Sequence, residues 1–354
     1  MNSEVASAVG LDATDAEALG SFLTGVDSFV SAVPYWLNPG ITAVAIRARA
    51  CMCDLGGNTD LVLEQLKLDE AAAEADIAIV PDCGQVPGMG TSLSVYAMSM
   101  LDRTDHLFMW DGGNDQHPRP PFNYISTFHV AGLTNEYYGE AIFLRDGKVV
   151  RVPTFLREDY EEVEFPAPIG TMEAFIAGGG TSTAPWTFEG KVQTFQNKTL
   201  RWKGHFEQWK FIIDTGLMDL KPVLVNGQPV VPRDVLHACV GPKITAGPDD
   251  RDFVIITIRA RGPDLKGHRQ SAIVGLANDA VIIVEVTGSN VHPEGGPDLR
   301  IWYTAFEIWI SWTATPVRSA TVIWESVVRR SAGSAMTLPS SRTSPSCNTP
   351  ALSA

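Results

Sequence analysis

The stretch that decides the fold of this chain is Cys51-Met52-Cys53-Asp54-Leu55-Gly56-Gly57-Asn58-Thr59-Asp60. It begins with a short apolar run that ends in an aspartate and a pair of glycines. The cap-like Asn-Thr-Asp comes next, and a long helical pattern follows it. This order predicts a strand, a tight turn and a helix. In an open α/β sheet, such a junction is where a ligand is held.

The same pattern occurs on both sides of this stretch. Apolar runs at 29–33 and 77–80 predict two more buried strands, and helical patterns follow the three strands at 39–49, 60–75 and 91–101. Strands that alternate with helices in this way predict a parallel sheet with right-handed crossovers. No Gly-x-Gly-x-x-Gly occurs in the first 30 residues, so we expect an incomplete Rossmann-type sheet that lacks the first half of a dinucleotide domain.

The turns after the three strands should converge, because parallel strands place their carboxyl ends on one edge of the sheet. Small residues after the first strand would let a dinucleotide approach closely, and the two glycine amides at the helix N-terminus would accept an anionic group. Two carboxylates at this edge suit a cationic substrate. The predicted cofactor-binding residues are Ser31, Ala32, Val33, Pro34, Asp54, Leu55, Gly56, Gly57, Asp82 and Gly84.

Structural roles compete with this interpretation. The segment from Ser31 to Pro34 also fits a simple strand terminator. Asp54 or Asn58 also fits the role of a helix cap. The sequence leaves these alternatives open.

Strand patterns dominate from about residue 105 onward, and hairpin signals at Asp146-Gly147 and Asn226-Gly227 favour antiparallel pairing. Helical patterns at 204–216 and 232–240 interrupt the strands. The predicted fold class is therefore α/β plus α+β. The predicted domains are a partial Rossmann-type dinucleotide domain at 1–104, a largely antiparallel α+β domain at 105–307, and a disordered or out-of-frame tail at 308–354.

Two candidates for chemistry lie at a strand-to-helix junction in the second domain. Arg201 suits a substrate carboxylate, and His205 suits proton transfer near neutral pH; surface solvation and capping are the alternatives. His129, inside an expected strand at 124–130, is interpreted as a core histidine. Gly178-Gly179-Gly180 is interpreted as a surface turn rather than a phosphate loop.

Composition excludes some classes of function. The formal net charge of −14 argues against a nucleic-acid partner. No apolar stretch is long enough to cross a membrane, and the N-terminus has no secretion signal, so we expect a cytoplasmic protein. The five cysteines form neither a disulfide framework nor a zinc pattern. We expect small buried side chains in a reducing compartment.

Taken together, several motifs resemble the saccharopine dehydrogenase-like family over about residues 10–307, and within it the lysine 6-dehydrogenase type. They are Val30-Ser31-Ala32-Val33-Pro34-Tyr35, the stretch from Cys53 to Asp60, Pro81-Asp82-Cys83-Gly84-Gln85-Val86-Pro87-Gly88-Met89, Gly132-Leu133-Thr134-Asn135-Glu136, Thr183-Ala184-Pro185-Trp186-Thr187-Phe188 and Lys198-Thr199-Leu200-Arg201-Trp202-Lys203-Gly204-His205.

The resemblance implies a Rossmann domain that binds NAD, with NADP possible, joined to a substrate and dimerisation domain. It implies hydride transfer from the carbon that bears the lysine ε-amine. The resulting imine is hydrolysed to a semialdehyde, which cyclises to piperideine-6-carboxylate. Asp54, Asp82 and His205 are then the catalytic candidates, and Asn58, Pro87, Gly88 and Arg201 the substrate-binding ones. We expect a small amino-acid substrate, a homodimer, and neither a metal ion nor a membrane partner.

Two alternatives stay open. A saccharopine or carboxynorspermidine dehydrogenase-like oxidoreductase would handle extra carboxylates, and more than one arginine at the site would favour it. An inactive, truncated binding or oligomerisation module belongs to another class. Without the glycine fingerprint, we expect this chain to bind NAD weakly or not at all.

Overall fold

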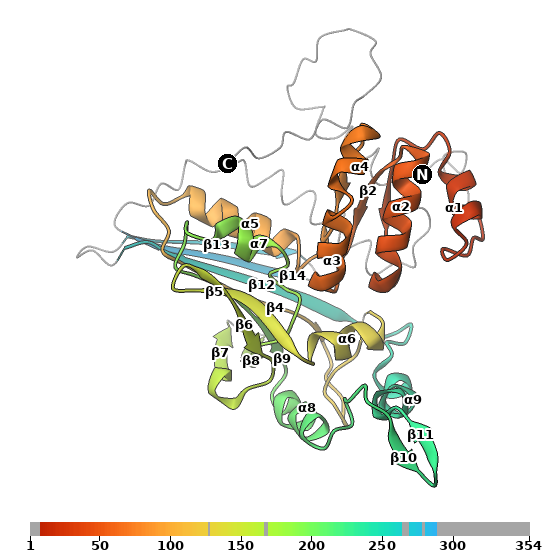
Figure 1. Ribbon diagram of the computed structural model, residues 1–354. Helices are drawn as coiled ribbons and strands as arrows, with labels where there is room; N and C mark the ends of the chain where they lie inside the picture. The colour runs from red at the N-terminus through yellow and green to blue at the C-terminus, as the bar shows by residue number, and fades with distance from the viewer. Residues whose placement is uncertain (1–7, 127, 166–168, 264–268, 278–279, 289–354) are drawn as a thin grey trace. The chain divides into compact units, whose positions relative to one another are not determined.

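The computed structural model describes residues 8–126, 128–165, 169–263, 269–277 and 280–288. Of these, residues 8–85 form one compact unit, unit 1, and residues 86–288 form a second, unit 2 (Figure 1). The predicted tail after residue 307 lies outside the described residues. Within the described ranges, no helix is long and apolar enough to cross a membrane.

Unit 1 contains a three-stranded parallel sheet in the order β1-β2-β3. Helices α1, α2 and α3 lie side by side over one face of it (Figure 1). Asp15 caps α1 by accepting from the N–H groups of Glu17 and Ala18, and Pro39 occupies the first turn of α2, where a missing N–H costs nothing. The elements are α1 (Ala16–Leu23), β1 (Ser28–Ser31), η1 (Tyr35–Leu37), α2 (Asn38–Ala48), β2 (Cys51–Asp54), α3 (Thr59–Leu66), α4 (Asp69–Glu74) and β3 (Ile79–Val80).

The core of unit 1 lies between this sheet and its helices. Met52 of β2 packs into it, together with Leu19 and Leu23 of α1 and Ile41 and Val44 of α2. The expected single helix at 60–75 is wrong, because the helix is interrupted between α3 and α4. Two acidic residues at the start of α4 favour a new N-terminus there, where they meet the positive end of the helix dipole.

Unit 2 is built on a nine-stranded mixed sheet, ordered β13-β14-β12-β4-β9-β5-β6, with β7 and β8 attached through β9. Most neighbours pair antiparallel; β12 with β14 and β4 with β9 are the parallel pairs. The predicted α/β plus α+β class is confirmed. The strands are β4 (His106–Asp115), β5 (Glu140–Arg145), β6 (Lys148–Pro153), β7 (Glu161–Phe165), β8 (Gly170–Phe175), β9 (Thr194–Arg201), β12 (Asp252–Arg261), β13 (Arg269–Ala277) and β14 (Ala280–Gly288).

The other elements of unit 2 are mostly helices, with one further hairpin. Helix α5, whose residues we expected in the first domain, packs against β12, β4 and β14 of unit 2. Gly90 explains this close packing, since a Cβ there would lie 2.4 Å from the sulfur of Met109. These elements are α5 (Met89–Ser99), α6 (Val130–Glu136), η2 (Arg157–Asp159), α7 (Ala184–Phe188), α8 (His205–Asp214), the hairpin β10 (Val223–Val225) and β11 (Gln228–Val230), and α9 (Pro232–Ile244).

The expected strand at 124–130 is wrong. Among the described residues of this range, Ser126 alone forms a bridge, to Thr245, and α6 begins at Val130. His129 is the N-cap of α6, and its Nδ1 accepts the N–H of Ala131 at 3.1 Å. This histidine is therefore a helix cap rather than a core histidine.

Candidate functional site

The predicted convergence of the strand-end turns in unit 1 is confirmed. Asp54 ends β2 fully buried, and its Oδ1 accepts from the main-chain N–H of Gly56 at 2.8 Å and of Asp82 at 3.2 Å. Its Oδ2 accepts from the side-chain amide of Gln65 at 2.8 Å. Asp54 therefore ties the turn after β2 to the turn after β3, which is a positioning role.

The two glycines allow this close approach. A Cβ on Gly56 would lie 1.7 Å from Oδ1 of Asp82, and a Cβ on Gly57 would lie 3.2 Å from Cβ of Tyr35, beyond β1. Both glycines also have positive φ, +73° and +123°, a region that side chains disfavour. The turns after all three strands thus pack on one another, while Leu55 is half-buried and Gly84 buried.

The residues after β1 divide into buried and exposed positions. Ser31 is buried and donates its hydroxyl to Oδ1 of Asn38 at 2.8 Å. Ala32 and Val33 are exposed beyond the strand end, and Pro34 is half-buried. Their role in binding a cofactor stays a prediction.

The predicted substrate-binding residues belong to different units. Asn58 lies in unit 1, and the capping alternative holds for it, because its Oδ1 accepts the N–H of Leu61 at 3.2 Å. Pro87, Gly88 and Arg201 lie in unit 2, the first two immediately before α5. Their contact with a substrate stays a prediction.

Arg201 is the centre of a buried polar cluster in unit 2. It is 3% exposed, its Nε donates to the hydroxyl of Tyr137 at 2.8 Å, and an Nη donates to the carbonyl of Leu200 at 2.9 Å. Its Cζ lies 5.0 Å from the ring centroid of Tyr124, whose hydroxyl also hydrogen-bonds with it. The alternative interpretation of Arg201 as a solvated surface side chain is therefore wrong.

His205 belongs to the same cluster. It has no exposed surface, and its Nε2 lies 3.0 Å from the hydroxyl of Tyr137. Its ring stacks on Phe175 and Trp209. Burial, reinforced by the charge of Arg201, holds the pKa of His205 well below its ordinary value. The expectation that His205 titrates near neutral pH is therefore wrong.

Two carboxyl groups near Arg201 were not among the predicted site residues. Burial raises the pKa of Glu136, at the end of α6, to about 8. It raises the pKa of Asp111, on β4, to about 6, against a hydrogen bond from Asn197 and the charge of Arg201. The only sequence feature that marks Glu136 is its position at the end of one of the motifs that carry the family resemblance. No sequence feature marks Asp111, since only the pairing of β4 with β9 brings it near Arg201.

We call Asp111, Tyr124, Glu136, Tyr137, Arg201 and His205 the Arg201 cluster. A guanidinium has five N–H donors, more than the contacts with Tyr137, Leu200 and Tyr124 require. Such a group suits a carboxylate, and neighbouring carboxyls that titrate between mildly acidic and mildly basic pH suit proton exchange. The cluster therefore combines the residue types that an amino-acid site needs; its contact with a substrate stays a prediction.

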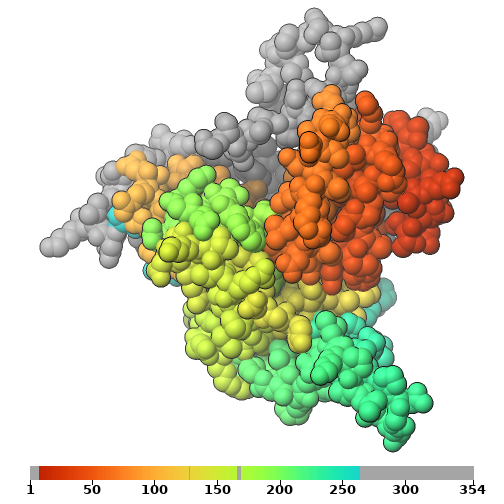
Figure 2. All heavy atoms as spheres, in the orientation of Figure 1, coloured from red at the N-terminus to blue at the C-terminus, as the bar shows by residue number. Residues whose placement is uncertain are grey.

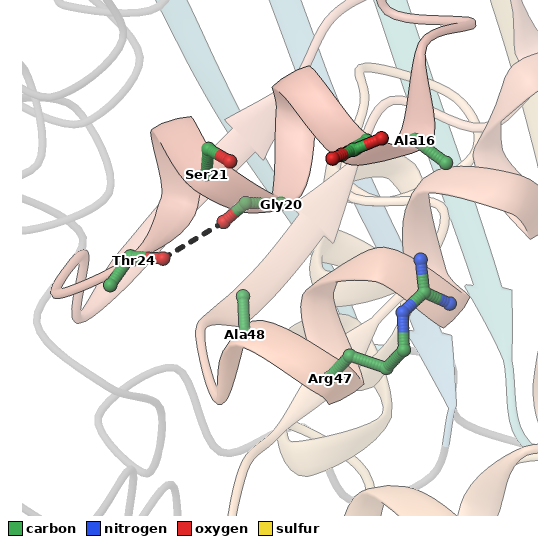
Figure 3. Close-up of a pocket in the computed structure, with 7 residues that line it drawn as sticks. Ala16, Gly20, Ser21, Thr24, Arg47 and Ala48 are labelled. Atoms are coloured by element: carbon green, nitrogen blue, oxygen red, sulfur yellow. Dashed lines mark hydrogen bonds between the residues drawn. The ribbon is translucent and has the colours of Figure 1, made fainter.

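Unit 1 contains pockets that the predicted site residues do not line. One of about 560 Å³ lies between α1 and the end of α2, where Glu17 and Arg47 bring opposite charges (Figure 3). Thr24, on its rim, donates to the carbonyl of Gly20 at 3.0 Å. A second, of about 260 Å³, lies along α3, α4 and β3. None of the predicted site residues lines either pocket.

These observations define a class of protein, in which a Rossmann-like α/β unit precedes an α+β unit with a largely antiparallel sheet. The saccharopine dehydrogenase C-terminal domain family matches residues 84–307. The chain belongs to this family.

A curated protein and a solved structure from Saccharomyces cerevisiae, both named as the saccharopine dehydrogenase that forms L-glutamate, are similar to this chain. The curated protein saccharopine dehydrogenase [NADP(+), L-glutamate-forming] is 23% identical over 254 residues, which cover 68% of this chain and 55% of the relative. The chain thus spans about half the length of that relative. The solved structure of apo histidine-tagged saccharopine dehydrogenase (L-Glu forming) superposes with a TM-score of 0.57 at 16% identity, covering 92% of this chain and 81% of that one. This likeness concerns the fold.

Proposed function

We propose that this chain carries the amino-acid site of a nicotinamide-dependent dehydrogenase that acts on a CH–NH or CH–NH2 group. The observation that carries the proposal is the burial of Arg201 against Tyr137 and Tyr124. A buried guanidinium held in a fixed orientation discriminates strongly for a carboxylate, because its planar donors match the two carboxylate oxygens. Family membership supports the same class of reaction.

The residues of this chain would bind the substrate and move its proton. Arg201 would hold the carboxylate, and a base must remove a proton from the amine so that its lone pair can assist the departure of hydride. Asp82 in unit 1 and Asp111 and Glu136 in unit 2 are the carboxyl candidates, since Asp54 has a positioning role. Among them, Glu136 has a pKa near 8, which suits a base at neutral pH.

We propose that a nicotinamide cofactor binds at the strand-end edge of unit 1. Ala32 and Val33 are exposed there, directly after β1, which supports this proposal. When bound, the cofactor supplies the hydride acceptor. We propose NAD, with NADP as the alternative; the curated relative is named for NADP(+).

Lysine is the substrate that we propose, with its ε-amine oxidised to the semialdehyde, which cyclises. Saccharopine and carboxynorspermidine carry further carboxylates, and a second free arginine would favour them. Besides Arg201, Arg233 is the other buried arginine among the described residues. Its Nε donates to the carbonyl of Met218 at 2.8 Å, and its guanidinium lies 4.4 Å from the ring of Tyr138. These contacts favour a structural role and, with it, the lysine proposal.

Fluorescence of reduced nicotinamide tests the enzymatic part of the proposal. The chain is mixed with excess NAD or NADP and with lysine, saccharopine or no amine. Lysine-dependent reduction supports a lysine dehydrogenase, and reduction with saccharopine alone favours the rival substrate. A folded chain that reduces neither cofactor with any amine contradicts the enzymatic proposal and favours the silent binding module.

We also propose that two copies of the chain pair. The hairpin β10–β11 projects from unit 2 beside α9 (Figures 1 and 2), and residues 222–232 contain no charged side chain. Leu224, the middle residue of β10, is 78% exposed. Strands β10 and β11 form a sheet of their own, so each has an outer edge, and a second hairpin related by a twofold axis would pair along it.

A further inference from the structure

Cys53 and Cys83 lie together at the carboxyl ends of β2 and β3. In the register of the two strands, Cys53 is opposite Val80. Cys83 follows β3, and its N–H donates to the carbonyl of Asp54, the neighbour of Cys53, at 2.7 Å. The thiol of Cys83 turns back to within 3.4 Å of the carbonyl of Val80. Both cysteines therefore adjoin the same residue of β3.

The two thiols lie close enough for each to shift the pKa of the other, and both are free. Cys83 is exposed and Cys53 half-buried, so a small reagent can reach the pair. The expectation that the cysteines are small buried side chains is therefore wrong for Cys83, and also for Cys239, which is exposed on α9.

We propose that Cys53 and Cys83 form a peroxide-reactive dithiol, which a hydroperoxide converts to an intramolecular disulfide. Residues joined by a disulfide need neighbouring backbones and thiols within reach, and the contacts around Val80 supply both. No part of the proposed dehydrogenase reaction uses this pair. It is a modification site in its own right, and its substrate class is the hydroperoxides.

The surroundings assign different roles to the two sulfurs. The neighbouring thiol of Cys83 lowers the pKa of Cys53, against the effect of burial. The thiol of Cys53 in turn raises the pKa of Cys83, and burial adds to this effect. Because the thiolate is the nucleophile, Cys53 reacts first and Cys83 resolves the product.

The reaction balances in two steps. The Cys53 thiolate attacks one peroxide oxygen, so an S–O bond forms and the O–O bond breaks; the hydroxide that leaves is protonated to water. The Cys83 sulfur then attacks the Cys53 sulfur, so the S–S bond forms and the S–O bond breaks. The proton of Cys83 goes to the departing oxygen and gives a second water. Both sulfurs are oxidised by one electron each, and the peroxide is reduced.

The disulfide would add a covalent link between the turns that Asp54 already joins by hydrogen bonds. Cys53 directly precedes Asp54, and Cys83 directly follows Asp82. Oxidation would therefore fix the position of both acidic residues at the strand-end edge of unit 1. This consequence does not depend on which cofactor or substrate binds there.

Peptide mapping of the full chain tests the proposal. The folded, reduced protein receives a limiting dose of hydrogen peroxide, free thiols are alkylated, and the unreduced digest is analysed by mass spectrometry. We expect a linked peptide pair that contains Cys53 and Cys83 and disappears on reduction. Cys239, an exposed thiol on another element, is the internal control and should oxidise at least about tenfold more slowly.

Two conservative variants separate the roles of the sulfurs. In Cys83→Ser, a sulfenic acid should accumulate at Cys53 and react with dimedone. In Cys53→Ser, Cys83 should stay as unreactive as Cys239. Absence of the linked peptide, equal oxidation of Cys239, or the same yield of link in protein denatured before oxidation would each overturn the proposal.

Discussion

The Nε of Arg201 lies 2.8 Å from the hydroxyl oxygen of Tyr137, the residue that directly follows α6. The same hydroxyl lies 3.0 Å from Nε2 of His205. One phenol therefore connects the buried cation of β9 to the buried imidazole that begins α8. Because a buried cation is costly unless hydrogen bonds compensate it, this contact is central to the Arg201 cluster.

Removal of that hydroxyl should destabilise unit 2. Tyr137→Phe keeps the ring, which packs against Phe155 and Trp209, but leaves Arg201 and His205 without their shared partner. We expect a loss of about 1–3 kcal/mol in the free energy of unfolding, measured by chemical denaturation. Tyr138→Phe is the matched control; that neighbouring tyrosine is exposed, and its change should stay within about 0.5 kcal/mol. Equal effects would show that the shared hydroxyl is unimportant.

Glu136 should make stability fall as pH rises. Its pKa is raised from 4.5 to about 8, so the folded state holds the proton more tightly than the unfolded state. This contribution is fully present below pH ~4.5 and is lost as pH rises through ~8. Glu136→Gln, which cannot ionise, should flatten that decline in melting temperature. Exposed Glu158→Gln should leave it unchanged. A wild-type decline that survives in Glu136→Gln would refute this assignment.

Gly56 should tolerate alanine poorly. Its φ is +73°, and the added Cβ would lie 1.7 Å from Oδ1 of Asp82, so both strain and a clash follow. We expect a loss of about 2–4 kcal/mol on thermal or chemical unfolding. Gly25 has a similar φ of +80° but nothing within 4 Å of its Cβ position. Gly25→Ala should therefore cost only about 1 kcal/mol. Equal losses of stability in Gly56→Ala and Gly25→Ala would mean that the turn after β2 can move to accommodate the added Cβ.

The exposed hairpin should govern self-association. Leu224→Asp places a charge at a side chain that is 78% exposed, so it should leave the fold intact and separate the two copies. Light scattering coupled to gel filtration should report about half the wild-type mass. Leu220→Asp, at a side chain 58% exposed outside the hairpin, is the control. A wild-type monomer, or a dimer unaffected by Leu224→Asp, would contradict the pairing proposal.

Periodic patterns predicted most of the fold. The three parallel strands of unit 1 follow from buried apolar runs, and the hairpin β5–β6 follows from its Asp146-Gly147 turn, which the register confirms. The hydrophobic pattern led to wrong predictions where polar or charged side chains decided the local structure. His129 ends an apolar stretch that resembles a strand, but its side chain caps a helix instead. The strand β7 was not predicted, because its acidic residues do not resemble a strand pattern, although it pairs with β8 along its whole length.

The site was predictable only in part. Asp54 and Asp82 were expected to meet because both follow parallel strands, and they do. The burial of Arg201 and His205 was not predictable, since their local sequence is cationic and polar. Burial of His205 depends on Tyr137, which follows α6, and on Phe175 of β8, both distant in sequence, together with Trp209 of its own helix. Asp111 and Glu136 reach Arg201 only through the tertiary fold.

Titration calorimetry with lysine tests whether the Arg201 cluster is an amino-acid site. We expect a saturable heat for the wild-type chain and an affinity at least about tenfold weaker in Arg201→Lys, which keeps the charge but loses the planar fork. Circular dichroism confirms that both proteins are folded. A folded wild-type chain that gives no saturable heat, or an Arg201→Lys variant that binds lysine equally well, would contradict this assignment.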